Sequence, residues 1–249
     1  MTAAETLTDR EGLSPAELIP LLDSAAEAAG ALRARATEAV KAKVAPGGKI
    51  DNAALEQEEH VAHGLSWIAT YAEGVRQLAD YAKRMDGEGR FGEMEALLAQ
   101  IGAGEYLAQL AGGVTMSQGE VVRLHELGLP DSARSEFLTK EVSALIQAVT
   151  PEMRARVVAL IQDAQGAAAA NYGDPGLEET YEDIRNEMRR FSEAEVVPNA
   201  QEWHLKDEYI PIELINHMAE LGVFSLTLPE EYGGLGLGKE AMCVVSEEL

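Results

Sequence analysis

Two histidines of this chain have the spacing of a metal-binding pair. His60 and His63 lie three residues apart, directly after Glu58 and Glu59, in a stretch with a helical pattern. Side chains three positions apart share one face of a helix, so these imidazoles and carboxylates could bind the same metal ion. No further ligand follows at a recognisable spacing. We therefore interpret the four residues as a solvated helix face and predict no metal site.

A glycine run near the end of the chain could contact a nucleotide. Residues 236–241, GLGKEA, fit the loose G-x-G-x-x-G/A pattern, and backbone amides before a helix can bind a pyrophosphate. A dinucleotide-binding fold also needs an apolar strand before the turn and an acidic residue about 20 positions later. Pro229, Glu230 and Glu231 occupy the approach, and the sequence ends at Leu249. The run is interpreted as a structural turn.

The other reactive or stacking side chains favour structural roles. Trp67 and Tyr71 are four residues apart and could stack on an adenine, but this spacing is more typical of core packing. Ser225 and Thr227 have no histidine in a nucleophile arrangement, and Cys243 lies in an apolar helical stretch without a flanking base. We assign no nucleophile.

Capping and periodicity divide the first part of the chain into helices. Ser14 and Glu17 have the spacing of a capping box that starts a helix, whose apolar stripe reaches about Val40 and which residues 45–48, Ala-Pro-Gly-Gly, end. The further helices that we predict are 51–85, 91–101 (ended by Gly102 and Gly104), a helix opened by a second capping box at Ser117–Glu120 and stopped by Gly128 and Pro130, 131–149 capped by Asp131, and 151–166.

A change of composition near residue 172 predicts a boundary between two domains, 1–172 and 173–249. In the second domain, Asp174 is expected to cap a helix that Pro198 ends. The later elements that we predict are a helix over 211–221 with Gly222 as its left-handed stop, an extended segment over 223–228, and a helix from Glu240 to Leu249.

The composition predicts a globular all-α protein. Hydrophobic residues make up 46% of the 249 residues, and the abundant unbranched side chains favour helix. The formal charge of −23 opposes binding to nucleic acid and to anionic membranes. Cys243 is the single cysteine, so no intramolecular disulfide can form. Because the sequence has no signal peptide and no apolar run of about 18 residues, we expect a cytoplasmic protein.

Residues 178–249 resemble the amino-terminal helical domain of acyl-CoA dehydrogenases in the order and spacing of several short motifs. In chain order these motifs are a charged helix ending in Arg189-Arg190-Phe191, then Val197-Pro198, Glu202-Trp203, Pro211, Leu221-Gly222-Val223, Pro229 to Gly236, and Ser246-Glu247-Glu248-Leu249. Together they identify the family. The resemblance implies that the chain ends within this domain.

The resemblance implies an FAD enzyme that oxidises a CoA thioester to its 2,3-enoyl form. A glutamate base removes the α-proton, the β-hydrogen passes as hydride to flavin N5, and an electron-transfer flavoprotein collects the electrons. We also expect a homo-oligomer. The family's catalytic and flavin-binding residues are expected beyond Leu249. No catalytic, cofactor-binding or metal-binding residue is therefore assigned within the chain, its substrate-binding residues are unknown, and the fragment alone is expected to be inactive.

The first 172 residues form a helical extension that ordinary family members lack. Residues 63–71, Ser117–Glu120 and Leu127-Gly128 resemble the long extension of the branch that oxidises (2S)-methylsuccinyl-CoA to mesaconyl-CoA in the ethylmalonyl-CoA pathway. Our hypothesis is that residues 173–249 form one wall of the acyl cleft, while the extension restricts access or stabilises the assembly.

Two alternatives to this function stay open. The chain could belong to another extended acyl-CoA dehydrogenase with a different acyl-CoA substrate, or it could be a non-catalytic helical interaction protein. The apolar helix at the end of the sequence lacks a capping residue, which favours a fragment over a stand-alone protein.

Overall fold

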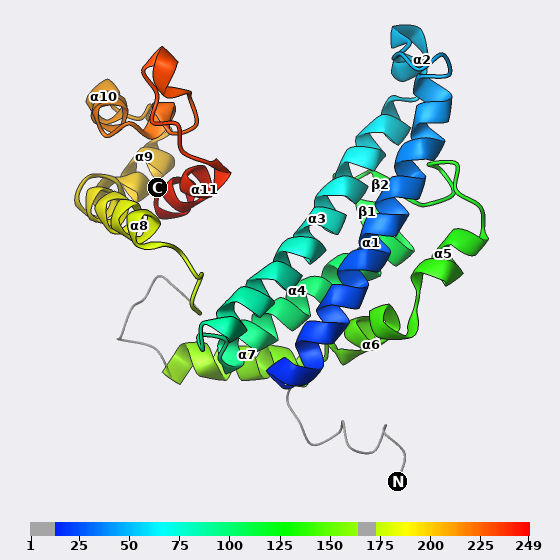
Figure 1. The fold of residues 1–249 in the computed structure, drawn as a ribbon. Coiled ribbons are helices and arrows are strands. Elements are labelled where there is room, and N and C mark those ends of the chain that lie inside the picture. Colours follow the sequence, from blue (N-terminus) through cyan, green and yellow to red (C-terminus); the bar gives the residue numbers. More distant parts are fainter. Residues whose placement is uncertain (1–12, 164–172) are drawn as a thin grey trace. The chain divides into compact units, whose positions relative to one another are not determined.

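The computed structural model describes residues 13–163 and 173–249, and the chain divides into two compact units (Figure 1). The first unit comprises residues 1–176 and the second unit residues 177–249. Each has a hydrophobic core of its own. Helices dominate both units, and the only strands among the described residues form one short hairpin. The predicted all-α class is confirmed.

Long antiparallel helices build the first unit. Its elements are α1 (Pro15–Val44), α2 (Asn52–Gln57), α3 (Glu59–Gly87), α4 (Glu93–Gly112), β1 (Val114–Thr115), β2 (Val121–Val122), α5 (Ser132–Phe137), α6 (Lys140–Ala148) and α7 (Pro151–Asp163). Helices α1, α3 and α4 each contact the other two, and α6 contacts both α4 and α1 (Figure 1). The core lies between these helices.

The first helix begins as the sequence predicts. The backbone amide of Ser14 donates to the Glu17 carboxylate at 3.0 Å, which completes the capping box, and Pro15 occupies the first turn. The helix ends at Val44, directly before residues 45–48, which were predicted to end it. Its buried face repeats at intervals of three and four residues: Leu18, Leu22, Ala25, Ala29, Leu32, Ala36, Val40 and Val44. Because several of these residues are alanines, α3 can approach closely.

Gly102 and Gly104 do not end a helix, contrary to our prediction. Helix α4 runs through both of them to Gly112. A Cβ atom on Gly104 would lie 2.4 Å from Val149 Cγ2 and 2.8 Å from the carbonyl oxygen of Leu145. The glycine therefore allows close contact with α6 and the residue that follows it, and this packing outweighs the low helix propensity of glycine.

Two predicted helices are interrupted. The helix expected over 51–85 breaks at Glu58 into α2 and α3. The helix expected over 131–149 breaks after α5, where the Thr139 hydroxyl accepts a hydrogen bond from the Val142 amide at 3.2 Å and caps α6. The cap at Thr139 was recognisable in the sequence, since this threonine directly precedes an apolar helical stretch.

The second predicted capping box belongs to a β-hairpin instead of a helix. The Ser117 hydroxyl does donate to the Glu120 carboxylate at 3.1 Å, but these residues form the turn between β1 and β2. Val114 pairs with Val122, and both are fully buried. Because β-branched residues flank the turn on both sides, strand formation prevails over the capping signal. Residues 124–128 form a turn.

The second unit is a smaller helical cluster. Its elements are α8 (Glu179–Phe191), a π-helical turn (Ser192–Val196), α9 (Val197–Lys206), α10 (Ile212–Glu220), two 3₁₀ turns (Val223–Ser225 and Glu230–Tyr232) and α11 (Lys239–Glu248). The buried core residues are Met188, Phe191, Leu214, Leu226 and Val245. Helices α8 and α11 contact each other directly.

Predictions for the second unit are confirmed for α10, α11, the left-handed Gly222 and the helix that carries Tyr181 to Phe191 (α8), and three details are wrong. Asp174 does not cap α8, because that helix begins at Glu179. Pro198 lies in the first turn of α9 instead of ending α8. The segment 223–228 contains a 3₁₀ turn and is not extended. The predicted end of the 151–166 helix lies outside the described residues.

Candidate functional site

An ion-pair network joins the first and last helices of the second unit. The Arg189 guanidinium on α8 binds the Glu248 carboxylate on α11 through two hydrogen bonds, 2.9 Å from Nε and 2.7 Å from Nη2. Arg185 lies one helical turn earlier, donates to Glu247 at 2.9 Å and has its Nε 3.3 Å from Glu248. The Arg185 side chain is only 3% exposed. Such a charge must be paired to be tolerated in the interior.

The network connects two motifs that lie far apart in the sequence. Arg189 belongs to the Arg-Arg-Phe motif and Glu248 to the final Ser-Glu-Glu-Leu motif. Both motifs are recognisable in the sequence, but their contact was not predicted. A signal existed, since Arg185 falls between Ile184 and Met188 on the apolar side of α8. A charged residue in that position indicates a buried partner.

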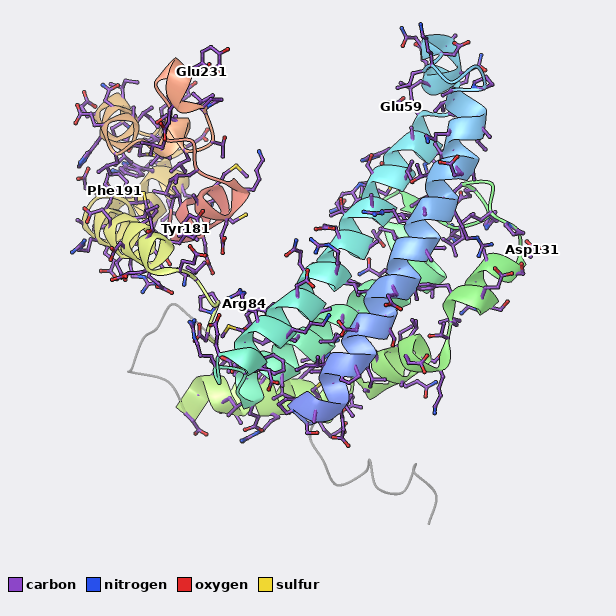
Figure 2. All side chains as sticks on the ribbon, viewed as in Figure 1. Glu59, Arg84, Asp131, Tyr181, Phe191 and Glu231 are labelled. Atoms are coloured by element: carbon purple, nitrogen blue, oxygen red, sulfur yellow. The ribbon has the colours of Figure 1, made fainter. Side chains whose placement is uncertain are left out.

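A second polar contact lies where α8 ends. The π-helical turn contains Glu195, whose carboxylate is 2.8 Å from Nδ1 of His217 on α10. The His217 ring also meets Phe191 edge to face, with 5.1 Å between ring centroids. Figure 2 labels Phe191 and Tyr181, which both lie on α8. This contact fixes α10 against the end of α8.

A pocket of about 500 Å³ lies in the second unit. Its lining comes from the turn before α9, from α9 and α10, and from the last residue: Val196, Ala200, Trp203, His204, Asp207, Glu208, Ile210, Leu214, Ile215, Met218 and Leu249. The size is within the range of small-molecule sites. Most of the lining is apolar, and its charged residues are Asp207 and Glu208. The pocket therefore suits an apolar group rather than a phosphate.

The glycine run before α11 is a closed turn. The amides of Leu235, Gly236 and Leu237 donate to the carbonyl oxygens of Ser225, Leu228 and Leu226 at 3.0, 2.8 and 2.8 Å. These amides are therefore not available to a pyrophosphate. The geometry supports the structural interpretation of residues 236–241.

His60 and His63 of the first unit do not share a ligand, and each contacts a different side chain. His60 Nε2 lies 3.6 Å from the Glu126 carboxylate, whereas His63 Nε2 accepts a hydrogen bond from Trp67 Nε1 at 3.0 Å. Within residues 13–163 and 173–249, no group of three or more His, Cys, Asp or Glu residues is placed to hold a metal ion.

Trp67 and Tyr71 are packing residues, as predicted. Their rings meet edge to face at 6.0 Å, and Tyr71 stacks on Tyr106 of α4 at 4.8 Å. The Tyr71 hydroxyl and the Gln109 side-chain oxygen are 3.1 Å apart. Trp67 and Tyr71 are partly buried against the core.

The remaining candidates do not converge on a reactive centre. The Ser225 hydroxyl donates to the carbonyl oxygen of Gly222 at 3.1 Å, and Cys243 is exposed on α11. In the described part of the chain, no helix is both long enough and apolar enough to cross a membrane.

The chain is similar to acyl-CoA dehydrogenases. Residues 178–249 match the family model described as acyl-CoA dehydrogenase, N-terminal domain. The chain is 48% identical over 234 residues to (2S)-methylsuccinyl-CoA dehydrogenase of Cereibacter sphaeroides, covering 94% of this chain and 42% of that relative. It is 35% identical over 78 residues to glutaryl-CoA dehydrogenase of Desulfococcus multivorans, covering 30% of this chain and 20% of the relative.

A mammalian relative shows the same limited overlap. Short-chain specific acyl-CoA dehydrogenase of Rattus norvegicus is 35% identical over 78 residues, covering 31% of this chain and 19% of the relative. The chain thus spans less than half the length of these relatives. Residues 178–249 match the amino-terminal domain of acyl-CoA dehydrogenases, and the similarity to (2S)-methylsuccinyl-CoA dehydrogenase also covers most of the preceding extension.

Proposed function

We propose that the full-length protein containing this chain is an FAD-dependent acyl-CoA dehydrogenase that oxidises (2S)-methylsuccinyl-CoA to mesaconyl-CoA. One observation supports this choice of substrate: the match to (2S)-methylsuccinyl-CoA dehydrogenase extends over 94% of the chain. The glutaryl-CoA and short-chain enzymes match only 30% and 31% of it. The extension therefore distinguishes this branch from the other relatives named above.

The second unit is proposed to form one wall of the acyl cleft. Its mostly apolar pocket of about 500 Å³ supports this role, because an acyl chain needs an apolar surface. The extension is proposed to restrict access to the cleft or to stabilise the assembly. The boundary between the two domains is proposed near the predicted position of residues 172 and 173, and the two compact units divide four residues later, after Gly176.

We propose no flavin site within the described residues. The amides of Leu235, Gly236 and Leu237 donate to backbone carbonyl oxygens, and the charged residues of the pocket lining are acidic, which supports this proposal. We therefore place the flavin and the catalytic glutamate beyond Leu249, where FAD would supply the hydride acceptor. An electron-transfer flavoprotein as electron acceptor, a homo-oligomeric state, a cytoplasmic location and a role in the ethylmalonyl-CoA pathway belong to the same proposal.

Steady-state oxidation by the full-length protein tests the substrate. The substrates to compare are (2S)-methylsuccinyl-CoA, glutaryl-CoA and butyryl-CoA, with one artificial electron acceptor for all three. We expect the highest kcat/KM with (2S)-methylsuccinyl-CoA. A higher kcat/KM with glutaryl-CoA or butyryl-CoA would favour another acyl-CoA dehydrogenase, and a protein without flavin or oxidation would favour a helical interaction protein.

Deletion of residues 1–172 from the full-length protein tests the role of the extension. If the extension restricts access or stabilises the assembly, the shortened enzyme will oxidise a wider range of acyl-CoA substrates or melt at a lower temperature. Unchanged selectivity together with an unchanged melting temperature would contradict this role.

A further inference from the structure

The last four residues of the first unit lie against α3 and α4. We call residues 173–176, with the sequence Gly-Asp-Pro-Gly, the strap. The Arg90 guanidinium binds the Asp174 carboxylate through two hydrogen bonds, 2.8 Å from Nε and 2.6 Å from Nη2. Arg84, labelled in Figure 2, donates from Nη1 to the carbonyl oxygen of Gly176 at 2.7 Å. Bidentate pairing with arginine requires a carboxylate in a defined orientation.

The backbone of the strap is also bound. The Asp174 amide donates to Glu95 Oε1 at 2.7 Å, and the Tyr81 hydroxyl donates to the Asp174 carbonyl oxygen. Burial is the largest influence on Tyr81 and raises its pKa to about 12, so the phenol keeps the proton that it donates. Within the strap, the Gly176 amide donates to Asp174 Oδ1 at 2.8 Å and closes a turn.

Glu95 belongs to the helix structure as well as to this contact. Its side chain is buried, and its second oxygen accepts the amide of Gly92 at 3.0 Å, which caps α4. The carboxylate is therefore held in place by the start of α4. A partner group held by the helix itself does not have to be ordered when the strap binds, which lowers the entropy cost of the contact.

The contact excludes side chains at both ends of the strap. Gly173 and Gly176 have φ angles of +98° and +67°, a region that L side chains rarely adopt. A Cβ atom on Gly176 would lie 2.6 Å from Met85 Sδ and 2.7 Å from Arg84 Nη1. A Cβ atom on Gly173 would lie 3.3 Å from Glu95 Oε1. The surface therefore accepts glycine at the two ends and an aspartate between them.

We propose that Tyr81, Arg84, Arg90 and Glu95 form an intramolecular docking site that is specific for the Gly-Asp-Pro-Gly strap. The bound strap fixes the point at which the chain leaves the extension, directly before the acyl-CoA dehydrogenase domain. The chain therefore leaves the extension from a fixed point, and the strap is not a flexible linker. The docking site itself does not depend on the proposed function. Only the description of the following domain as an acyl-CoA dehydrogenase domain rests on it.

Amide hydrogen exchange, measured by NMR on the 249-residue chain, tests the docking site without any enzyme activity. Arg90→Ala removes the bidentate contact, and we expect exchange at Asp174 and Gly176 to become at least about tenfold faster. Arg156→Ala is the matched control, because Arg156 forms a similar bidentate pair with Glu93 of α4, with both distances at 2.7 Å, away from the strap. We expect this control to leave both strap amides unchanged.

A glycine substitution tests the specificity for the strap sequence. Gly176→Ala should release the strap and accelerate exchange at Asp174, whose amide donates to Glu95. Gly48→Ala is the control, since Gly48 has a similar φ of +77° but a Cβ atom there would meet nothing within 4 Å. Unchanged exchange at the strap amides in Arg90→Ala, or equal acceleration in Arg156→Ala, would overturn the proposal. Unchanged exchange in Gly176→Ala would overturn its sequence specificity.

Discussion

Arg189 and Glu248 close the second unit by joining its first helix to its last. The two hydrogen bonds between them measure 2.9 and 2.7 Å, and Glu248 is 7% exposed. Hydrogen bonding to Glu248 raises the pKa of the Arg189 guanidinium above its ordinary value. Because the pair is shielded from solvent, removal of Glu248 would leave a buried positive charge unpaired, which costs more than the loss of a surface ion pair.

Glu248→Gln is expected to destabilise the second unit. The substitution keeps the shape of the side chain but leaves Arg185 and Arg189 without their shared negative charge. We expect the free energy of unfolding to fall by about 2 kcal/mol or more. Glu247→Gln is the control, because Glu247 is 59% exposed and its loss should cost less than about 1 kcal/mol.

Denaturant unfolding followed by tryptophan fluorescence measures this difference. The chain has two tryptophans, Trp67 in the first unit and Trp203 in the second. A Trp67→Phe background therefore reports the second unit alone. Equal losses in the Glu247 and Glu248 variants would contradict the role assigned to burial.

Gly104→Ala is expected to destabilise the first unit although alanine favours helix. The new methyl group would overlap Val149 and the carbonyl oxygen of Leu145. We expect a loss of about 1–3 kcal/mol in the free energy of unfolding. Gly112→Ala in the same helix has open space and should be neutral or stabilising by up to about 1 kcal/mol. A Trp203→Phe background reports this unit, and a stable Gly104→Ala variant would refute the close contact.

Elements that depend on signals from neighbouring residues were predictable from the sequence. The capping box at Ser14 and the left-handed stop at Gly222 depend on neighbouring residues, and both predictions are confirmed. Gly104 and Ser117 were misread because their outcome depends on distant partners. Gly104 fits against Leu145 and Val149 of a later part of the chain, and Ser117 lies between two strands that pair with each other.

Acid is expected to weaken the strap through Asp174. Burial would raise the pKa of Asp174, but hydrogen bonds from Arg90 and from the Gly176 amide outweigh it and hold the pKa below the ordinary value of 3.8. The stabilisation from this group is therefore complete above pH 3.8 and is lost as the pH falls through the lower folded-state pKa.

Comparison with Asp174→Asn isolates this effect. The free energy of unfolding of the first unit should differ between the two proteins at about pH 6, and the difference should shrink near pH 3. Glu73, whose pKa is lowered to about 2 chiefly by hydrogen bonding to Arg76, titrates in both proteins and cancels. A difference that stays constant over this range would exclude Asp174 as the titrating group.

The candidate site was less predictable than the fold. Family motifs in the sequence pointed to residues 178–249, but the contact between Arg185 and Glu248 spans both ends of this region and no local pattern encodes it. The strap was also missed. Asp174 has the residue type and position of a helix cap, and its actual partner, Arg90, lies 84 residues away.

The most direct test of the proposed function is an anaerobic titration of the full-length protein with (2S)-methylsuccinyl-CoA, followed by flavin absorbance. We expect the purified protein to show an oxidised flavin band, and we expect this band to bleach as the substrate is added while mesaconyl-CoA forms. A protein without a flavin band, or a band that (2S)-methylsuccinyl-CoA leaves unchanged while butyryl-CoA or glutaryl-CoA bleaches it, would contradict the proposed activity.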